Sequence, residues 1–229
     1  STLMRSSAAS DVYKRQVMGA LVYLVKTRLP EYIGASPFEI QVLTPMRKGE
    51  LGVEHLNEVL QYYLNPASES KKEKEGRTGV FREGDKVMQV KNNYKLEWKI
   101  TNAKGFSIEE GLGVFNGDMG IIKQINTYSE RITVVFDENR EAEYPFSSLD
   151  ELELAYAITI HKSQGSEYPA VVLPLLSGPP ILCNRNLLYT AITRAQKCVA
   201  IAGRQSMVEQ MIHNETEQKR YSGLNDCLK

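Results

Sequence analysis

The 229-residue sequence lacks several features that would each point to a particular class of protein. It has no excess of charge of either sign, because 28 lysines and arginines balance 28 aspartates and glutamates. This balance excludes a globally basic nucleic-acid binder of the histone type, so any anion-binding surface must be local. There is no apolar run of about eighteen residues and no charged-then-apolar leader, so we expect neither a membrane span nor secretion.

Cysteine is scarce, and its spacing matches neither a disulfide framework nor a metal site. Cys183, Cys198 and Cys227 are odd in number and lie in or after apolar segments. Scattered cysteines of this kind are typical of reduced thiols. We therefore expect a cytoplasmic protein without disulfides and without a metal site.

The sequence also lacks the two segments with which phosphoryl-transfer enzymes hold ATP and magnesium. It contains no Gly-Lys-Ser or Gly-Lys-Thr, the end of the loop that holds the β- and γ-phosphates. The run ITVVFDENRE imitates the acidic strand end that manages magnesium, but Asp137 and Glu138 follow no phosphate loop. We interpret DENR as a hairpin turn and expect no magnesium site there.

The spacing of apolar residues predicts an α/β domain at the start of the chain. After a polar opening, an apolar stripe from Val17 to Leu29 predicts a helix that Pro30 ends. EIQVLTP predicts a short strand, and the stretch after Gly49 predicts a second amphipathic helix. Residues 1–16 have weaker periodicity, and we expect them to be a non-native or disordered leader.

The period changes from helical to alternating after a charged segment. Residues 68–79, SESKKEKEGRTG, mix both charges without an apolar side chain, which predicts a surface linker. Short strand candidates then follow, separated by turns: DKVMQV, MGIIKQI, RITVVF and EAEYPF. We expect a small antiparallel β-barrel over 80–151, inserted into an α/β domain that is made of 17–79 and 152–229.

A polar segment, TIHKSQGSEYP over 159–169, lies between two apolar strand candidates. In a parallel α/β sheet, ligands bind where the chain leaves the carboxyl end of a strand. Thr159 can cap a helix, and Lys162 can neutralise a phosphate. Gly165 allows close backbone approach, and Glu167 can accept from a sugar hydroxyl. By spacing alone, the segment fits a polar surface turn as well as a ligand site.

Two further segments place arginine near the ends of regular elements. In LLYTAITRAQK, 187–197, apolar side chains can face a core while Tyr189, Thr193 and Arg194 project elsewhere. An arginine on a rigid helix can stabilise the charge that spreads over a γ-phosphate during its transfer. In LTPMRKG, Arg47 and Lys48 follow a strand end and precede a glycine. Either arginine is equally compatible with an ordinary surface position.

In this order, the segments resemble the C-terminal half of RecD-like helicases of superfamily 1, the exodeoxyribonuclease V alpha-subunit type. The resemblance runs from Val17 to Leu224 and is carried by QVLTPMRKG, FREGDKVMQVKNNY, VFNGDMGII, AYAITIHKSQGSEYP and LLYTAITRAQKCVAI. It implies a RecA-like motor domain, the second of its protein, with a parallel sheet. It also implies that the insert is a small antiparallel barrel of the Src-homology-3 type that lies against single-stranded DNA.

The resemblance implies roles for individual residues. Arg47 matches the motif IV arginine at the nucleotide phosphates, and Arg194 matches the motif VI arginine finger, so both are catalytic candidates. Gly165 and Glu167 match the nucleotide side of motif V, where the glutamate meets the ribose. The candidates for contact with DNA are Thr159, His161, Ser163, Asn92, Asn93 and Tyr94, with Asn116 beside them. Tyr94 and Trp98 offer stacking faces, although core packing is the commoner use of an aromatic side chain.

The implied function is that of an ATP-dependent DNA helicase or translocase that moves from 5′ to 3′. Because the phosphate loop is absent, we expect this chain to be inactive alone. ATP and Mg²⁺ would be bound mainly by an upstream RecA-like domain of the same protein. The expected partners are single-stranded DNA, that domain and other recombination subunits, with no membrane. Two alternatives stay open: a stand-alone module that binds single-stranded nucleic acid, and a protein-docking domain without motor activity.

Overall fold

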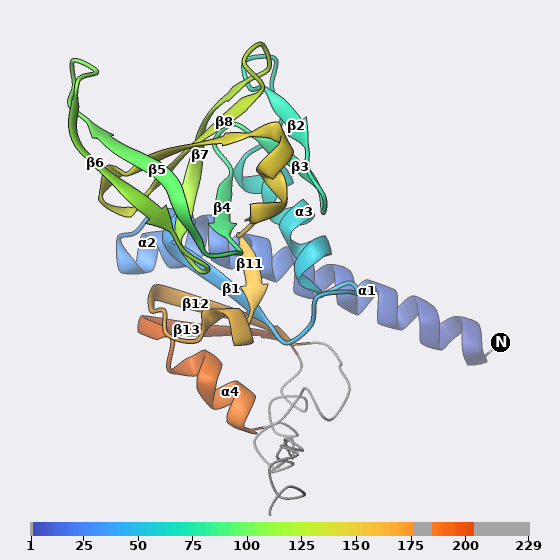
Figure 1. Ribbon diagram of the computed structural model, residues 1–229. Helices are drawn as coiled ribbons and strands as arrows, with labels where there is room; N and C mark the ends of the chain where they lie inside the picture. Colours follow the sequence, from blue (N-terminus) through green and yellow to red (C-terminus); the bar gives the residue numbers. More distant parts are fainter. Residues whose placement is uncertain (1, 176–184, 204–229) are drawn as a thin grey trace, which may run out of the picture.

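The computed structural model describes residues 2–175 and 185–203, and for residues 2–10 it describes the backbone alone. A parallel sheet in the lower half of Figure 1 carries an antiparallel sheet above it. The fold class predicted from the sequence, α/β with an antiparallel β insert, is therefore confirmed. No helix among the described residues combines the length and the apolar character that crossing a bilayer requires.

The parallel sheet is built from two distant parts of the chain. Its strands in spatial order are β11 (Ala157–Thr159), β1 (Ile40–Thr44), β12 (Tyr168–Leu175) and β13 (Ala195–Gly203). Val42 of β1 pairs with Ala157 on one side and with Val172 on the other. All five residues of β1 are buried, as expected for an inner strand of a parallel sheet.

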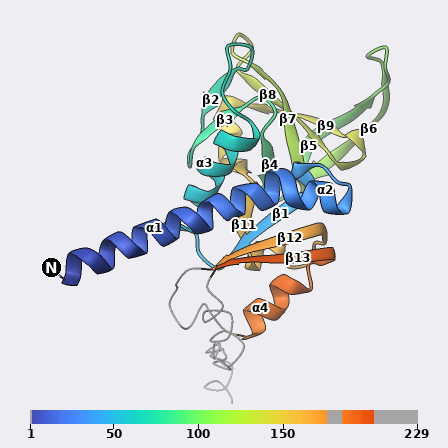
Figure 2. The same ribbon diagram turned by 180° about the vertical axis from the view of Figure 1, so that it is seen from behind.

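Helices cover the parallel sheet on opposite sides. Those near the sheet are α1 (Thr2–Tyr23), α2 (Leu29–Ile33), α3 (Val53–Leu64) and α4 (Arg185–Ile192). Helix α1 and helix α4 both contact β12 and β13, and they lie on different faces of the sheet in both views (Figures 1 and 2). The predicted stripe of Val17, Leu21, Val25 and Leu29 is buried against this core.

The prediction that Pro30 ends the first helix is wrong. A π-helical turn, Leu24–Arg28, joins α1 to α2, and Pro30 lies in the first turn of α2. Arg28 and Leu29 both have helical backbone angles, so the chain stays helical up to Pro30, and the irregular π-helical turn directly precedes the proline. The helix ends instead at Gly34, whose φ of 66° is left-handed and suits glycine.

The segment that interrupts the α/β domain, which we call the insert, forms a seven-stranded antiparallel sheet and a small two-stranded sheet. Its strands run from Glu73 to Leu154, beyond the 80–151 expected from the sequence. The seven strands in spatial order are β10 (Leu152–Leu154), β4 (Lys86–Gln89), β7 (Met119–Asn126), β8 (Arg131–Phe136), β9 (Glu141–Pro145), β5 (Asn93–Thr101) and β6 (Ser107–Val114). The small sheet pairs β2 (Glu73–Glu75) with β3 (Val80–Arg82). Part of the predicted surface linker is therefore a strand, and the linker prediction is wrong there.

Short 3₁₀ turns connect several of these elements. They span Pro37–Glu39, Asp137–Asn139, Phe146–Glu151 and His161–Ser163. The turn at Asp137–Asn139 joins the antiparallel strands β8 and β9, as the hairpin interpretation of DENR predicts.

A buried polar network joins the antiparallel sheet to the parallel sheet. The carboxylate of Asp85 accepts hydrogen bonds from Gln61 Nε2 at 2.6 Å and Asn65 Nδ2 at 2.8 Å, both on or next to α3. It also accepts from the Tyr156 hydroxyl at 2.8 Å and from the Arg82 backbone N–H at 2.7 Å. Burial raises the pKa of the Asp85 carboxyl, while these donors pull it back down.

Lys86, the next residue, extends the network to β1. Its Nζ donates to the Phe38 carbonyl at 2.7 Å and to Gln41 Oε1 at 2.8 Å. Burial lowers the pKa of Lys86 to about 7, against a weaker opposing effect from Glu39. Because these contacts connect β4 with α3, β1 and the chain just before β11, they hold the two sheets in one arrangement.

Candidate nucleotide and DNA sites

The predicted polar segment runs from the carboxyl edge of the parallel sheet back to its amino edge. Thr159 ends β11 level with Thr44, at the carboxyl edge of the sheet. The chain then returns to the amino edge, where Tyr168 begins β12 and Ala170 pairs with Ile40. We call residues 160–167 the crossing turn. Its two ends lie at opposite edges of the sheet.

The carboxyl-edge half of the crossing turn is closed by local hydrogen bonds. Thr159 Oγ1 accepts a hydrogen bond from the Lys162 backbone N–H at 3.2 Å, in the 3₁₀ turn whose N-cap residue is Ile160. Ser163 is fully buried, and its hydroxyl donates to the Ile160 carbonyl at 2.6 Å. The predicted contact between the Ser163 side chain and DNA does not fit this geometry. His161 is exposed at the start of the turn.

Lys162 ties the crossing turn to the antiparallel sheet. Its Nζ donates to Asn116 Oδ1 at 3.0 Å. The Asn116 backbone N–H in turn donates to Asn92 Oδ1 at 2.9 Å. Three residues from distant parts of the sequence are thus brought together, and all three lie in segments that the sequence had marked for DNA.

The other DNA candidates in the insert differ in how free their side chains are. Asn93 Nδ2 donates to both carboxylate oxygens of Glu151, at 3.2 and 3.0 Å, so its amide is used inside the fold. Trp98 is half-buried, with the Arg140 guanidinium 5.6 Å from its ring centroid. Tyr94, by contrast, is 68% exposed. Of these three, Tyr94 is the one whose side chain is open to a ligand.

The amino-edge half of the crossing turn meets Arg194. Arg194 lies between α4 and β13, and its Nη1 approaches the Ser166 carbonyl at 3.4 Å. Its Nη2 approaches Thr193 Oγ1 at 3.4 Å, and its Nε is buried without a hydrogen-bond partner in the described part of the chain. The Tyr168 backbone N–H donates to the Arg194 carbonyl at 2.8 Å, which fixes the backbone of both segments.

Gly165 and Glu167 lie beside this arginine in the crossing turn. Gly165 has a φ of 85°, and a Cβ built there would meet no atom within 4 Å, so its surroundings are open. Glu167 is exposed, with its Oε2 3.4 Å from Gln196 Nε2. Three of the four predicted nucleotide residues, Gly165, Glu167 and Arg194, are therefore brought together.

Arg47 is the fourth predicted nucleotide residue, and it lies elsewhere. It follows β1 at the carboxyl edge, where its Nη2 donates to both carboxylate oxygens of Glu153 at 3.2 Å. A strand the length of β1 spans roughly 17 Å, so about one strand length separates Arg47 from the amino edge. The structure does not bring Arg47 and Arg194 together.

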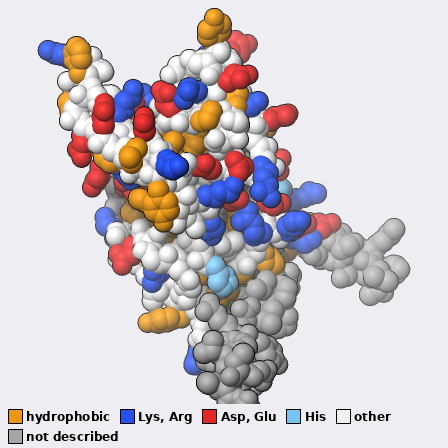
Figure 3. All heavy atoms as spheres, viewed as in Figure 1, with side chains coloured by type: hydrophobic (Ala, Val, Ile, Leu, Met, Phe, Trp, Pro, Cys, Tyr) orange, Lys and Arg blue, Asp and Glu red, His pale blue; other side chains and the backbone are white. Residues whose placement is uncertain are grey.

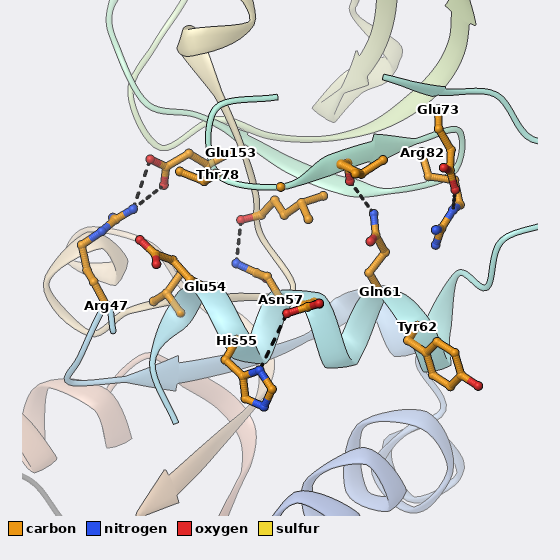
Figure 4. A pocket seen from close by; sticks show the side chains of 15 residues that line it. Arg47, Glu54, His55, Asn57, Gln61, Tyr62, Glu73, Thr78, Arg82 and Glu153 are labelled. Atoms are coloured by element: carbon orange, nitrogen blue, oxygen red, sulfur yellow. Dashed lines mark hydrogen bonds and ion pairs between the residues drawn. The ribbon is translucent and has the colours of Figure 1, made fainter. Parts of the chain in front are cut away.

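Arg47 lies at one side of a cavity of about 670 Å³ between α3, the β2–β3 hairpin and β10 (Figure 4). Most of its labelled side chains are polar, and several are already paired with one another in Figure 4. Asn57 Nδ2 donates to the Leu154 carbonyl at 3.0 Å, and Gln61 Nε2 donates to the Val80 carbonyl at 2.7 Å. The cavity thus marks the junction between insert and parallel sheet.

Within residues 2–175 and 185–203, no group of three or more His, Cys, Asp or Glu side chains is arranged to hold a metal ion. Cys198 is free and half-buried. The other two cysteines, Cys183 and Cys227, lie outside the described residues.

Sequence reasoning missed one residue next to these candidates. Phe115 is 40% exposed, and its ring contacts that of Tyr94 edge to face, with centroids 5.5 Å apart. The available signal was its place in VFNGD, directly before Asn116. An aromatic residue at the end of an apolar strand is usually part of the core, which is why the pattern did not mark it.

Two family models match adjoining parts of the chain. The SH3 domain of ATP-dependent RecD-like DNA helicases matches residues 56–136. The UvrD-like helicase C-terminal domain matches residues 154–202.

Curated relatives resemble the chain over most of its length. An ATP-dependent RecD2 DNA helicase from Deinococcus radiodurans is 39% identical over 167 residues, which are 73% of this chain and 20% of that protein. The RecBCD enzyme subunit RecD of Mycolicibacterium smegmatis is 30% identical over 191 residues, which are 83% of this chain and 29% of that protein. The chain thus spans less than a third of either relative.

Solved structures of Pif1 helicase from Bacteroides are also similar. The complex with single-stranded DNA matches with a TM-score of 0.44 and 17% identity, over 73% of this chain and 42% of that chain. The complex with ADP-AlF3 and single-stranded DNA matches with a TM-score of 0.44 and 20% identity, over 75% and 42% of the two chains. From the two family models and the RecD relatives, we conclude that this chain belongs to the RecD-like helicases and corresponds to a C-terminal part of them.

Proposed function

We propose that this chain is the C-terminal part of an ATP-dependent DNA helicase that moves along single-stranded DNA from 5′ to 3′. In this proposal the parallel sheet with its helices is a motor domain, and Arg194 is its arginine finger. The observation that carries the proposal is the contact between Arg194 and the crossing turn at Ser166. The contact joins the two segments, TRAQ and QGSEYP, that the resemblance assigns to the nucleotide.

The state of the Arg194 guanidinium supports a role in binding an anion. A buried N–H without a partner costs about 1–3 kcal/mol, and Arg194 Nε is such a group in the described part of the chain. Its other two contacts, at 3.4 Å, are at the long limit for hydrogen bonds. A phosphate oxygen would satisfy donors of this kind in a fork geometry. In the same proposal, Gly165 lets the nucleotide approach the backbone and Glu167 accepts from its ribose.

The opposite end of the crossing turn supports the DNA part of the proposal. His161 is exposed there, and Lys162 is held next to Asn116 and Asn92. Although the chain has no net charge, Lys and Arg side chains gather near the junction of the two sheets in Figure 3. Such a local basic surface suits a phosphate backbone. Thr159, His161, Asn92 and Tyr94 remain the proposed DNA contacts, with Asn93 and Ser163 shaping the surface from inside.

One segment therefore connects the two proposed ligands. A change at the nucleotide end of residues 160–167 would be felt at the DNA end, because the turn is short and the Ser166 backbone N–H donates to the Ser163 carbonyl at 3.0 Å, which links its two halves. ATP binding would close this domain against an ATP-binding motor domain, and hydrolysis would reopen it. That second domain, which we place upstream in the same protein, would bind ATP and Mg²⁺ for the most part.

Arg47 enters the proposal with a condition. To reach a nucleotide phosphate as a motif IV arginine, it would have to leave Glu153 and the sheet edge on which it lies. Domain closure is the step in which such a rearrangement would occur. We further propose that the whole protein acts in the cytoplasm, with other recombination subunits as partners.

The test measures ATP hydrolysis by a longer protein that contains this chain and an ATP-binding motor domain. Replacing an arginine finger lowers kcat by about 10³–10⁵. We therefore expect Arg194→Ala to abolish most DNA-stimulated hydrolysis while nucleotide still binds. Lys197→Ala, an exposed cation three residues further along β13, is the matched control and should leave the rate unchanged.

Other outcomes would redirect the proposal. If Arg194→Ala and Lys197→Ala had the same rate as the parent, Arg194 would be a surface arginine and a stand-alone nucleic-acid-binding module would be favoured. Hydrolysis at helicase-like rates by the isolated 229-residue chain would contradict the division of labour between two domains. Unwinding of a duplex with a 3′ tail in preference to a 5′ tail would contradict the direction of movement.

A further inference from the structure

An exposed aromatic pair lies where the insert meets the crossing turn. Tyr94 is 68% exposed and Phe115 is 40% exposed, and their ring planes meet at 65°. A second exposed aromatic pair, Tyr62 and Tyr63, lies on α3, so exposure alone does not mark the Tyr94–Phe115 pair as a binding site. In Figure 3 apolar side chains gather at the lower ends of β5 and β6, close to the parallel sheet.

The Phe115 ring is held in place by its own loop. A Cβ at Gly113 would lie 2.7 Å from Phe115 Cζ, so the ring packs directly over that glycine. Gly113 has a φ of 100°, which a residue with a side chain would rarely adopt. The Phe115 backbone N–H donates to Asp118 Oδ2 at 2.9 Å, which fixes the start of the turn. The ring is therefore in position before any ligand arrives.

A cation is held beside the same pair. Asn116 follows Phe115 directly, and its Oδ1 accepts from Lys162 Nζ at 3.0 Å. Asn92, two residues before Tyr94, holds the Asn116 backbone at 2.9 Å. These two bonds tie the lysine of the crossing turn to the residue that follows Phe115. An aromatic face and a lysine ammonium are the groups that suit the base and the phosphate of a nucleotide.

We propose that Tyr94, Phe115 and Lys162 form a subsite for one nucleotide of single-stranded DNA. The base stacks on the aromatic pair, and an adjoining phosphate pairs with the Lys162 ammonium. Stacking on an aromatic side chain accepts any base, because every base has a π face. The inference rests on the DNA part of the proposed function, and it assigns to Phe115 a role in binding.

The subsite also gives the insert a way to act on the motor. Lys162 belongs to the crossing turn, whose other end carries Gly165 and Glu167 beside Arg194. A nucleotide that is bound by both the barrel and Lys162 bridges the antiparallel sheet and this turn. Occupancy of the subsite would therefore hold the crossing turn in a defined position relative to the insert.

The test measures fluorescence anisotropy of labelled oligothymidylate with the 229-residue chain and with a longer protein that contains it. Stacking on one aromatic side chain is worth about tenfold in affinity, and we expect Phe115→Ala to lose that factor. Phe106→Ala is the matched control, because Phe106 is 68% exposed on the same β5–β6 hairpin but far along it from Asn116. It should bind like the parent.

Two further measurements separate stacking from a change of fold. The parent should bind an oligonucleotide with a single abasic site at the right position about tenfold more weakly than the intact oligonucleotide. Phe115→Ala should bind the two oligonucleotides with equal affinity. Lys162→Ala should reduce the slope of log affinity against log salt by about one. Unchanged circular dichroism and thermal unfolding would establish that the variants are folded.

The outcomes distinguish the subsite from the function on which it rests. If neither protein binds single-stranded DNA, the proposed function fails together with the subsite. If both bind it, but Phe115→Ala behaves like Phe106→Ala and no abasic position matters, the subsite alone is overturned. Equal competition by a blunt duplex would also overturn it, because a paired base cannot stack on the rings.

Discussion

Two regions are rich in polar side chains: the buried junction between the two sheets, and the amino edge of the parallel sheet. Only at the junction are the polar groups paired by short hydrogen bonds. At the junction, Asp85 accepts four hydrogen bonds of 2.6–2.8 Å, and Lys86 donates two of 2.7 and 2.8 Å. At the amino edge, the side-chain contacts of Arg194 and Glu167 are all 3.4 Å. Arg194 Nε there has no partner among the described residues.

This difference separates structural polarity from functional polarity. Buried polar groups stabilise a fold when every donor and acceptor is paired, as at the junction. Polar groups with long contacts and an unpaired donor contribute little to the fold and are available to a ligand or to another domain. Substitutions in the two regions should therefore differ strongly in their effect on stability, and the following predictions use that contrast.

The largest effect on stability is expected from Asp85→Ala. The substitution leaves donors of Gln61, Asn65, Tyr156 and Arg82 without their acceptor in a fully buried place. Each unpaired buried donor costs about 1–3 kcal/mol, so we expect a loss of at least about 3 kcal/mol in the free energy of unfolding. Urea denaturation measures it. Asp85→Asn keeps one acceptor oxygen and should cost about half as much; equal stability of both variants and the parent would contradict a complete network.

A smaller loss is expected from Asn57→Ala on α3. Its amide donates to the carbonyls of Leu154 and Ala157 at 3.0 Å and accepts from the Ala157 N–H at 2.8 Å. Those backbone groups lie at the end of β10 and the start of β11, so losing their partner should cost about 2–3 kcal/mol. The control is Glu58→Ala on the exposed face of the same helix, which should stay within about 0.5 kcal/mol in the same denaturation experiment.

The pH dependence of stability tests the junction through Lys86. Its pKa is about 7 in the folded chain against 10.5 for an unburied lysine. Between these values the folded lysine is neutral and the unfolded one is charged, so unfolding takes up a proton and becomes harder as the pH rises. We expect the free energy of unfolding of the parent, measured relative to that of Lys86→Met, to rise between pH 7 and pH 9 by on the order of 1 kcal/mol per pH unit. Lys95→Met, on exposed β5, should show no such trend.

The smallest effect on stability is expected at the amino edge. Arg194→Ala should change the free energy of unfolding by less than about 0.5 kcal/mol, because its side-chain hydrogen bonds to the described residues are both long, at 3.4 Å. The same variant is expected to lose most ATP hydrolysis in the longer protein. A loss of stability as large as that of Asn57→Ala would erase the contrast and make Arg194 a structural residue.

The sequence predicted mainly those strands whose apolar residues alternate because one face of the strand is buried. The change from helical to alternating spacing predicted the strands at DKVMQV, MGIIKQI, RITVVF and EAEYPF, which are β4, β7, β8 and β9. The hairpin of β5 and β6 went unpredicted, because its charged and apolar residues are both largely exposed and no buried face imposes a clean alternation.

Side-chain environments were harder to predict than elements. Ser163 and Asn93 carry polar groups in segments that resemble DNA-binding motifs, yet their partners are Ile160 and Glu151. Whether a polar side chain faces the fold or the solvent depends on tertiary contacts that one sequence does not display. The separation of Arg47 from Arg194 has a different origin, because Arg47 follows the carboxyl end of β1 and Arg194 precedes the amino end of β13.

The strand order also has a consequence for how the chain acquires its structure. Both neighbours of β1 come from beyond the insert: Val42 pairs with Ala157 and with Val172, more than one hundred residues later. The strands of the insert, by contrast, pair mainly with sequence neighbours such as β7 with β8 and β8 with β9. Contacts close in sequence form faster, so during synthesis the insert can fold while β1 still waits for its partners. The antiparallel sheet would then exist before the parallel sheet is complete.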